Sequence, residues 1–238
     1  MTTSSTSVAM TTFPASSANA ELVQRVEHNL AAVRARITSA GRDLTTVRIV
    51  AVTKTFGVDA VRAAVANGLT NLGENYVDEL CQKRTQSDDA TITWYYLGAV
   101  QSNKVKRVVE CADVICSVSR LKELERIATY APSRRLYVQV DYTGAPERNG
   151  AAEGDVAVLV ERGRALELDV RGLMTVAPSD PEGARRAFRS LGALADDLGL
   201  EERSMGMSDD LEVACEFGTS EVRIGRALFG ARAERGAA

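Results

Sequence analysis

Apolar residues recur along this chain with two alternating periods. From Glu21 to about Gly41 they fall at helical spacing, which predicts an opening amphipathic helix. The next apolar run, residues 47–53, is short, nearly continuous and rich in β-branched side chains. Such a run is typical of a parallel strand that is buried on both faces. A helix over residues 59–67 follows, and Gly68 is placed to end it.

The same alternation continues to the end of the chain. Further strands are predicted over residues 70–74, 92–97, 113–118, 135–141, 168–175, 203–205 and 221–224. Helices are predicted to run to about residue 86 and over residues 103–110, 121–130, 155–164, 184–198 and 210–216. Regular repeats with short connections predict an α/β fold, a single (β/α)8 TIM-type barrel with an extra N-terminal helix. An open doubly wound sheet is the alternative, but the first strand lacks the glycine fingerprint of that fold.

The composition argues against several classes of function. The 238 residues carry 29 basic and 32 acidic side chains, a formal net charge of −3, so no basic surface for nucleic acid is expected. His28 is the only histidine, which argues against histidine-based triads and two-histidine metal sites. The four cysteines have no metal-site or redox-motif spacing, and we interpret them as buried thiols in a reducing cytosol: Cys81, Cys111, Cys116 and Cys215.

The N-terminus differs from the rest of the chain. Residues 1–19 are rich in Ser, Thr and Ala and carry no charged side chain, which predicts a disordered tail before a barrel domain over residues 20–238. The segment lacks the positive start and apolar block of a signal peptide. No apolar stretch approaches the roughly 20 residues of a membrane span. We therefore expect a cytoplasmic protein, and a lone barrel without an obvious apolar stripe favours a monomer.

Lys54 directly follows the first barrel strand. In barrels of this type functional groups lie at the carboxyl ends of the strands. An amine at the edge of a dry strand loses hydration in its charged form, so the free amine that attacks an aldehyde is favoured. Lys54 is therefore a candidate Schiff-base lysine. A lysine whose aliphatic stem merely covers the strand end is the alternative that position alone leaves open.

Two loops near the C-terminus are candidates for an anion site. The segment 204–209 leads from a strand into a helix, with Ser208 or Asp209 as the expected N-cap. The loop after the last strand supplies Gly225, which permits close approach of the backbone, and Arg226, which opens the final helix. Barrel enzymes often bind phosphate with these two loops. Ordinary helix capping is the alternative, and we expect Asp209 and Asp210 to face solvent, because their charge would repel a phosphate.

Arg223 lies in a strand that alternates charged and apolar residues, so its side chain is predicted to point into the barrel. A buried arginine needs an acceptor. The ring nitrogen of a ligand is one candidate, and Glu221, two residues away on the same face, is the competing structural partner.

Six blocks of sequence form a specific pattern. They are AVTKTFGVDAV around Lys54, GLTNLGENYVDEL at 68–80, QSNKVKRVV at 101–109, GLMTVAP at 172–178, SMGMSDDLEVA at 204–214 and EVRIGRALFGAR at 221–232. Together these blocks closely resemble the pyridoxal phosphate homeostasis protein family. The resemblance spans roughly residues 21–232. It implies the barrel fold of bacterial alanine racemases and a role in the supply and balance of pyridoxal 5′-phosphate (PLP), carried as an internal aldimine and handed to apo-enzymes.

Site residues follow from the same resemblance. It implies that Lys54 is the aldimine lysine, that Asn75 lies beside the cofactor and that Arg223 faces the pyridine nitrogen. It also implies phosphate contacts from Ser204, Gly225 and Arg226. Arg226 stands where the family usually has threonine or serine, which removes a hydroxyl contact and leaves a backbone N–H and a guanidinium. Tyr95 stands where histidine is common, so the floor of the pocket is expected to differ.

A weak racemase-like enzyme is the alternative function. Such chemistry normally needs a second acid–base group, which alanine racemases take from an extra β domain. Four tyrosines are the candidates for a substitute: Tyr76, Tyr95, Tyr96 and Tyr142. We expect a PLP carrier that is not an enzyme.

Overall fold

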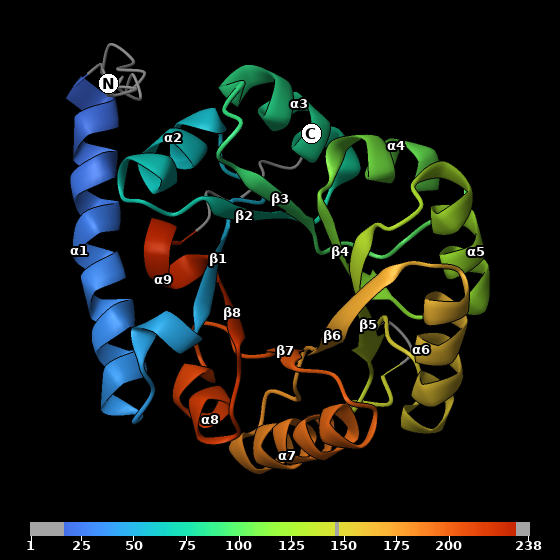
Figure 1. The fold of residues 1–238 in the computed structure, drawn as a ribbon. Helices are drawn as coiled ribbons and strands as arrows, with labels where there is room; N and C mark the ends of the chain where they lie inside the picture. Colours follow the sequence, from blue (N-terminus) through green and yellow to red (C-terminus); the bar gives the residue numbers. More distant parts are fainter. Residues whose placement is uncertain (1–16, 146–147, 232–238) are drawn as a thin grey trace, which may run out of the picture.

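The computed structural model describes residues 17–145 and 148–231, and within them eight parallel strands close into a barrel in chain order (Figure 1). The strands are β1 (Arg48–Val52), β2 (Asn71–Glu74), β3 (Thr93–Tyr96), β4 (Val114–Val118), β5 (Arg135–Val140), β6 (Asp169–Thr175), β7 (Glu202–Ser204) and β8 (Glu221–Ile224). Pairing of β8 with β1 closes the ring. The predicted barrel is confirmed, and each strand lies within two residues of its predicted bounds.

Helices surround the barrel (Figure 1). They are α1 (Ser17–Ser39), α2 (Val58–Ala66), α3 (Val77–Ser87), α4 (Val105–Cys111), α5 (Leu121–Tyr130), α6 (Val156–Ala165), α7 (Pro181–Asp197), α8 (Leu211–Glu216) and α9 (Arg226–Phe229), with 3-10 turns at Leu44–Thr46 and Glu153–Asp155. No described helix is long and apolar enough to cross a bilayer.

The extra helix α1 begins at Ser17, four residues earlier than predicted, so residues 17–19 belong to it and not to a tail. The rest of the predicted tail lies outside the described residues. α1 packs beside α2, α8 and the single turn of α9 (Figure 1). Its buried stripe of Val26, Leu30, Val33 and Ile37 faces the barrel, and Asn29 donates to the carbonyl oxygen of Leu228 at 2.8 Å. α1 thereby covers a sector that the short α9 leaves open.

Two apolar layers form the core. The larger one lies between helices and strands, and a smaller one of Val50, Tyr95, Val114, Cys116, Tyr137 and Met174 fills the barrel interior. Alternation along each strand assigns side chains to one layer or the other. Trp94 and Tyr96 pack outside, and Tyr95 packs inside. The departure at Tyr95 therefore lies in the interior layer, which also supports the pocket residues Leu97 and Val176.

The expectation of four free thiols is wrong for one pair. Cys81 of α3 and Cys111 of α4 form a disulfide, with their Cα atoms 5.2 Å apart. Adjacent barrel helices bring together residues that are 30 positions apart in sequence, which spacing motifs do not register. Cys116 and Cys215 are buried free thiols, as predicted.

Candidate cofactor site

A cavity of about 460 Å³ opens at the carboxyl ends of the barrel strands, a volume typical of small-molecule sites. Its walls are Val52, Lys54, Asn75, Leu97, Met174, Val176, Met207, Ser208, Asp209, Arg223, Gly225, Arg226 and Ala231. Five of the six predicted site residues line it, all except Ser204. Among the described residues of the lining, three side chains are cationic and one is anionic, so the cavity suits an anionic ligand.

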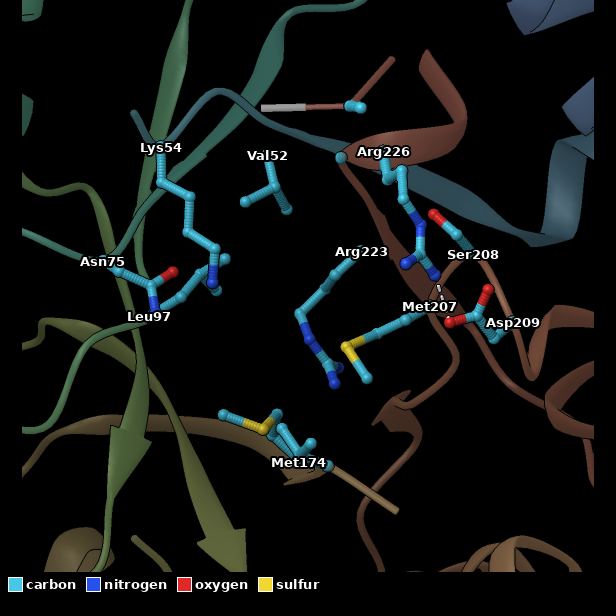
Figure 2. A pocket seen from close by; sticks show the side chains of 13 residues that line it. Val52, Lys54, Asn75, Leu97, Met174, Met207, Ser208, Asp209, Arg223 and Arg226 are labelled. Atoms are coloured by element: carbon cyan, nitrogen blue, oxygen red, sulfur yellow. Dashed lines mark hydrogen bonds and ion pairs between the residues drawn. The ribbon is translucent and has the colours of Figure 1, made fainter. Parts of the chain in front are cut away.

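Lys54 lies two residues beyond the end of β1 and is half-buried. Figure 2 shows its side chain extended into the cavity on the same side as Asn75. Asn75 follows the last residue of β2 and approaches Gly98 closely, because a Cβ on that glycine would lie 2.0 Å from the Asn75 carbonyl oxygen. Gly98 therefore permits the close approach of the loop that carries Asn75.

Arg223 points into the barrel, as predicted, and lies across the cavity from Lys54 (Figure 2). It is paired in register with Val50 of the interior layer and is 5% exposed. Its guanidinium donates to the Ser204 carbonyl oxygen at 2.7 Å, the Ser204 hydroxyl at 2.9 Å and the Thr175 carbonyl oxygen at 2.6 Å. Burial lowers its pKa from the usual arginine value.

Glu221, the competing partner for Arg223, has other contacts. It is fully buried and forms an ion pair with Arg48 at 3.0 Å, in a network that includes Tyr137 and Glu202. It also accepts a hydrogen bond from the Ser204 hydroxyl at 2.7 Å. Ser204 thus stands between Glu221 and Arg223, with no exposure to the cavity. The Ser204 hydroxyl is placed to orient Arg223, and the phosphate contact of Ser204 stays a prediction.

Ser208 is a second serine, in the loop that follows β7. It lines the cavity, and its hydroxyl accepts a hydrogen bond from the backbone N–H of Ala227 at 3.2 Å, which joins the two C-terminal loops. Gly225 lies opposite β1, where a Cβ would come within 3.2 Å of the Val52 carbonyl oxygen. These loops bring backbone and hydroxyl groups to one end of the cavity, the kind of donors that hold a phosphate.

Arg226 opens α9, as predicted, but its guanidinium already has a partner. It forms an ion pair with Asp209 at the rim of the cavity (Figure 2), and both side chains are exposed, by 61% and 80% respectively. The predicted N-caps were wrong, because the cap of α8 is Asp210, whose carboxylate accepts from the Met207 N–H at 2.5 Å. Asp209 faces solvent as expected, yet it also partly neutralises the guanidinium.

The tyrosines proposed as substitute acid–base groups lie elsewhere. None of the four is among the residues that line the cavity in the described part of the chain. Tyr95 is buried in the interior layer and Tyr76 is 51% exposed. Burial raises the pKa of Tyr96 to about 12, and its hydroxyl donates to the Ala99 carbonyl oxygen. Within the described residues there is no cluster of metal-ligating side chains either.

Comparison with known proteins places the chain in a family. A family model for the alanine racemase N-terminal domain matches residues 23–233. The pyridoxal phosphate homeostasis protein of Pseudomonas aeruginosa is 40% identical over 220 residues, which are 87% of this chain and 96% of that protein. The chain belongs to the pyridoxal phosphate homeostasis protein family. A family member from Vibrio alginolyticus is 35% identical and covers 88% of this chain and 97% of that protein.

Solved structures extend the family comparison to three dimensions. PipY of Synechococcus elongatus, solved with PLP bound, is 31% identical with a TM-score of 0.77 and covers 86% of this chain and 100% of PipY. Alanine racemase of Clostridium difficile shares the fold, with a TM-score of 0.72 at 15% identity over 89% of this chain and 58% of that enzyme. The family resemblance seen in the sequence is therefore confirmed.

Proposed function

We propose that this protein binds PLP in the cavity and holds it through the amine of Lys54, as a carrier in cofactor homeostasis. One observation carries the proposal: a lysine amine and an anion-suited pair of loops face each other across one cavity, with a buried arginine between them. Relatives named pyridoxal phosphate homeostasis protein and a family structure with PLP bound support it.

The residues present fit this cofactor group by group. PLP supplies an aldehyde that condenses with a primary amine and a ring that withdraws electrons. Lys54 would provide the amine and Asn75 a neighbouring amide. Ser208, Gly225 and the backbone of Arg226 would hold the phosphate. Arg223 would meet the ring nitrogen, and its fixed positive charge would keep that nitrogen unprotonated, which makes the ring a poor electron sink.

We favour a carrier over an amino-acid racemase because the cavity lacks a tyrosine acid–base group on its described walls. Asp209 is the one carboxylate among the described residues of the cavity wall, and it is largely exposed and paired with Arg226. No specific observation favours the racemase-like alternative. A carrier needs binding and release, which this arrangement of residues can supply without turning over a substrate.

The carrier would hand PLP to apo-enzymes through transient contacts, as a monomer in the cytoplasm. Disulfides are rare in that compartment because thiol reductants keep them open. The Cys81–Cys111 bond would therefore be exposed to reduction. We infer that the pocket keeps its PLP-binding geometry with that bond reduced.

Reductive trapping tests the proposal. Protein saturated with PLP is treated with borohydride, digested and mapped by mass spectrometry. We expect the cofactor mass on a peptide that contains Lys54, its loss in Lys54→Ala and its retention in Lys104→Ala, a control at an exposed lysine outside the cavity. A colourless saturated protein, or a label on another side chain, would refute the proposal.

A further inference from the structure

Lys83 is a lysine buried directly behind the loop that carries Lys54. It projects from α3, and its side chain is 6% exposed. Its ammonium donates to the Thr53 carbonyl oxygen at 2.7 Å and to Glu74 Oε1 at 2.6 Å, and it lies 3.7 Å from Glu79 Oε2. A buried ammonium is stable only where acceptors surround it, and these three provide that environment.

The acceptors are placed on both sides of Lys54. Thr53 precedes Lys54, and besides its carbonyl contact with Lys83 its hydroxyl donates to Glu74 Oε1 at 2.6 Å. Thr55 follows Lys54, and its backbone N–H donates to Glu79 Oε2 at 2.9 Å. Lys83 therefore links the peptide groups that flank the pocket lysine, one directly and the other through a carboxylate.

Thr55, in the loop that carries Lys54, has a backbone conformation that surrounding contacts must stabilise. Thr55 has a φ of 69°, in the left-handed region that a β-branched residue rarely adopts. Such a conformation persists only where surrounding contacts fix it. The Glu79 carboxylate provides one of these contacts, and Glu79 is one helical turn from Lys83 on α3.

Through Glu74, Lys83 is also connected to the loop that carries Asn75. Glu74 is the fully buried last residue of β2, and the next residue is Asn75, which lines the cavity beside Lys54. Because Glu74 accepts from both Lys83 and Thr53, the ends of β1 and β2 are joined through one carboxylate oxygen. A shift of Lys83 would therefore move two walls of the cavity together.

We propose that Lys83 is a positioning residue, which fixes the loop around Lys54 so that the Lys54 amine meets the aldehyde of the cofactor in a reactive orientation. The inference rests on the proposed function, since it concerns capture by Lys54. A simple stabilising ion pair would lower stability when removed, but it would leave the rate of capture per folded molecule unchanged.

Lys83→Met tests this role, because methionine keeps a long apolar stem without the ammonium. The rate of PLP attachment to Lys54, measured by timed borohydride quenching and peptide mass spectrometry well below the melting temperature, is expected to fall at least about tenfold. In the cofactor-free protein, hydrogen exchange of the Thr55 amide, followed by NMR, is expected to accelerate about tenfold. Arg84→Met is the matched control on the same helix, since Arg84 contacts Cys111 and Asp113, away from the pocket, and both readings should stay at wild-type values.

The outcomes separate the two proposals. Capture at the wild-type rate together with a protected Thr55 amide in Lys83→Met would overturn the positioning role and leave PLP binding intact. No PLP on Lys54 of the wild-type protein, with faster Thr55 exchange in Lys83→Met, would refute PLP capture and support the positioning of the loop.

A second pair of variants applies if Lys83→Met does not fold. Glu79→Gln keeps an acceptor for the Thr55 N–H, and Glu79→Ala removes it. We expect capture near the wild-type rate in the first and at least about threefold slower capture in the second. Equal rates in the two variants would overturn the inference.

Discussion

The two ends of the cavity are built from different kinds of interaction. At the Lys54 end, Lys83 and Glu74 form an ion pair of side chains that are 6% and 0% exposed. At the opposite end, the C-terminal loops are held by pairs that water reaches. Arg226 and Asp209 are 61% and 80% exposed, and Arg36 and Glu212 are 32% and 47% exposed.

The Arg36–Glu212 pair connects α1 to the loop that carries Ser208. Arg36 of α1 forms two hydrogen bonds with the Glu212 carboxylate and donates a third, at 2.9 Å, to the Ser208 carbonyl oxygen. Exposed ion pairs are weak and screened by salt, whereas buried ones are screened much less. The difference suggests that the Lys54 end is fixed and that the end formed by the C-terminal loops can be tuned, which suits the proposed carrier.

The largest effect on stability is expected from the disulfide beside the fixed end. Opening Cys81–Cys111, by reduction or by Cys81→Ser, frees a loop with a sequence separation of 30 residues and should lower the free energy of unfolding by about 3 kcal/mol. Chemical denaturation measures that change. If Lys83 holds the loop around Lys54, capture of PLP should stay within about twofold of wild type, which is a difference of less than about 0.5 kcal/mol. A large loss of capture would show that the disulfide, and not Lys83, fixes this end.

A smaller effect is expected at the rim, where Asp209→Asn removes the one carboxylate among the described residues that line the cavity. Without its negative charge, PLP should bind about threefold to tenfold more tightly at low salt, and pyridoxal, which lacks the phosphate, should be unaffected. Titration of bound-cofactor absorbance at two salt concentrations measures this. Asp78→Asn is the control, because Asp78 pairs with Arg107 in a similarly exposed site away from the cavity. Equal gains for PLP and pyridoxal would contradict the assignment of this rim to phosphate.

The smallest effect concerns pH. The hydrogen bond from Arg36 lowers the pKa of Glu212 below its ordinary 4.5. A carboxylate with a lowered folded pKa stabilises the protein above its unfolded pKa, and this contribution is lost as pH falls through the folded value. Below about pH 4.5 the pair should therefore weaken, by less than about 1 kcal/mol given its exposure.

Thermal unfolding at pH 6 and pH 3.5 measures this contribution. Glu212→Gln should show a smaller drop between the two than wild type. Glu216→Gln, which loses a partner of Arg185 on α7, should keep the Glu212 contribution to that drop. An identical drop in wild type and Glu212→Gln would show that this pair does not hold the loop.

Sequence reasoning succeeded where position along a strand decides the outcome. Lys54 and Arg223 could be placed because strand ends and alternating faces follow from local pattern. The rule is less informative at the end of a short strand. The strand β7 ends at Ser204, which is fully buried, and Ser208 in the following loop lines the cavity. The two serines are four positions apart in sequence.

Contacts between distant elements could not be predicted. Lys83 lies in a polar helical stretch, where the sequence pattern indicates a solvated side chain. Its burial depends on Glu74 of the preceding strand, a contact that the local pattern does not contain. The Cys81–Cys111 pair likewise depends on how α3 and α4 pack. The Asp209 partner of Arg226 comes from the other C-terminal loop. Each of these needs the closed barrel before its members can meet.

A crystal structure of the protein soaked with PLP tests the central claim most directly. We predict electron density continuous from the Lys54 Nζ into the cavity, with the phosphate between Ser208 and Gly225 and the ring nitrogen facing Arg223. Density for the cofactor outside this cavity, or inside it with the phosphate at the Lys54 end, would contradict the account.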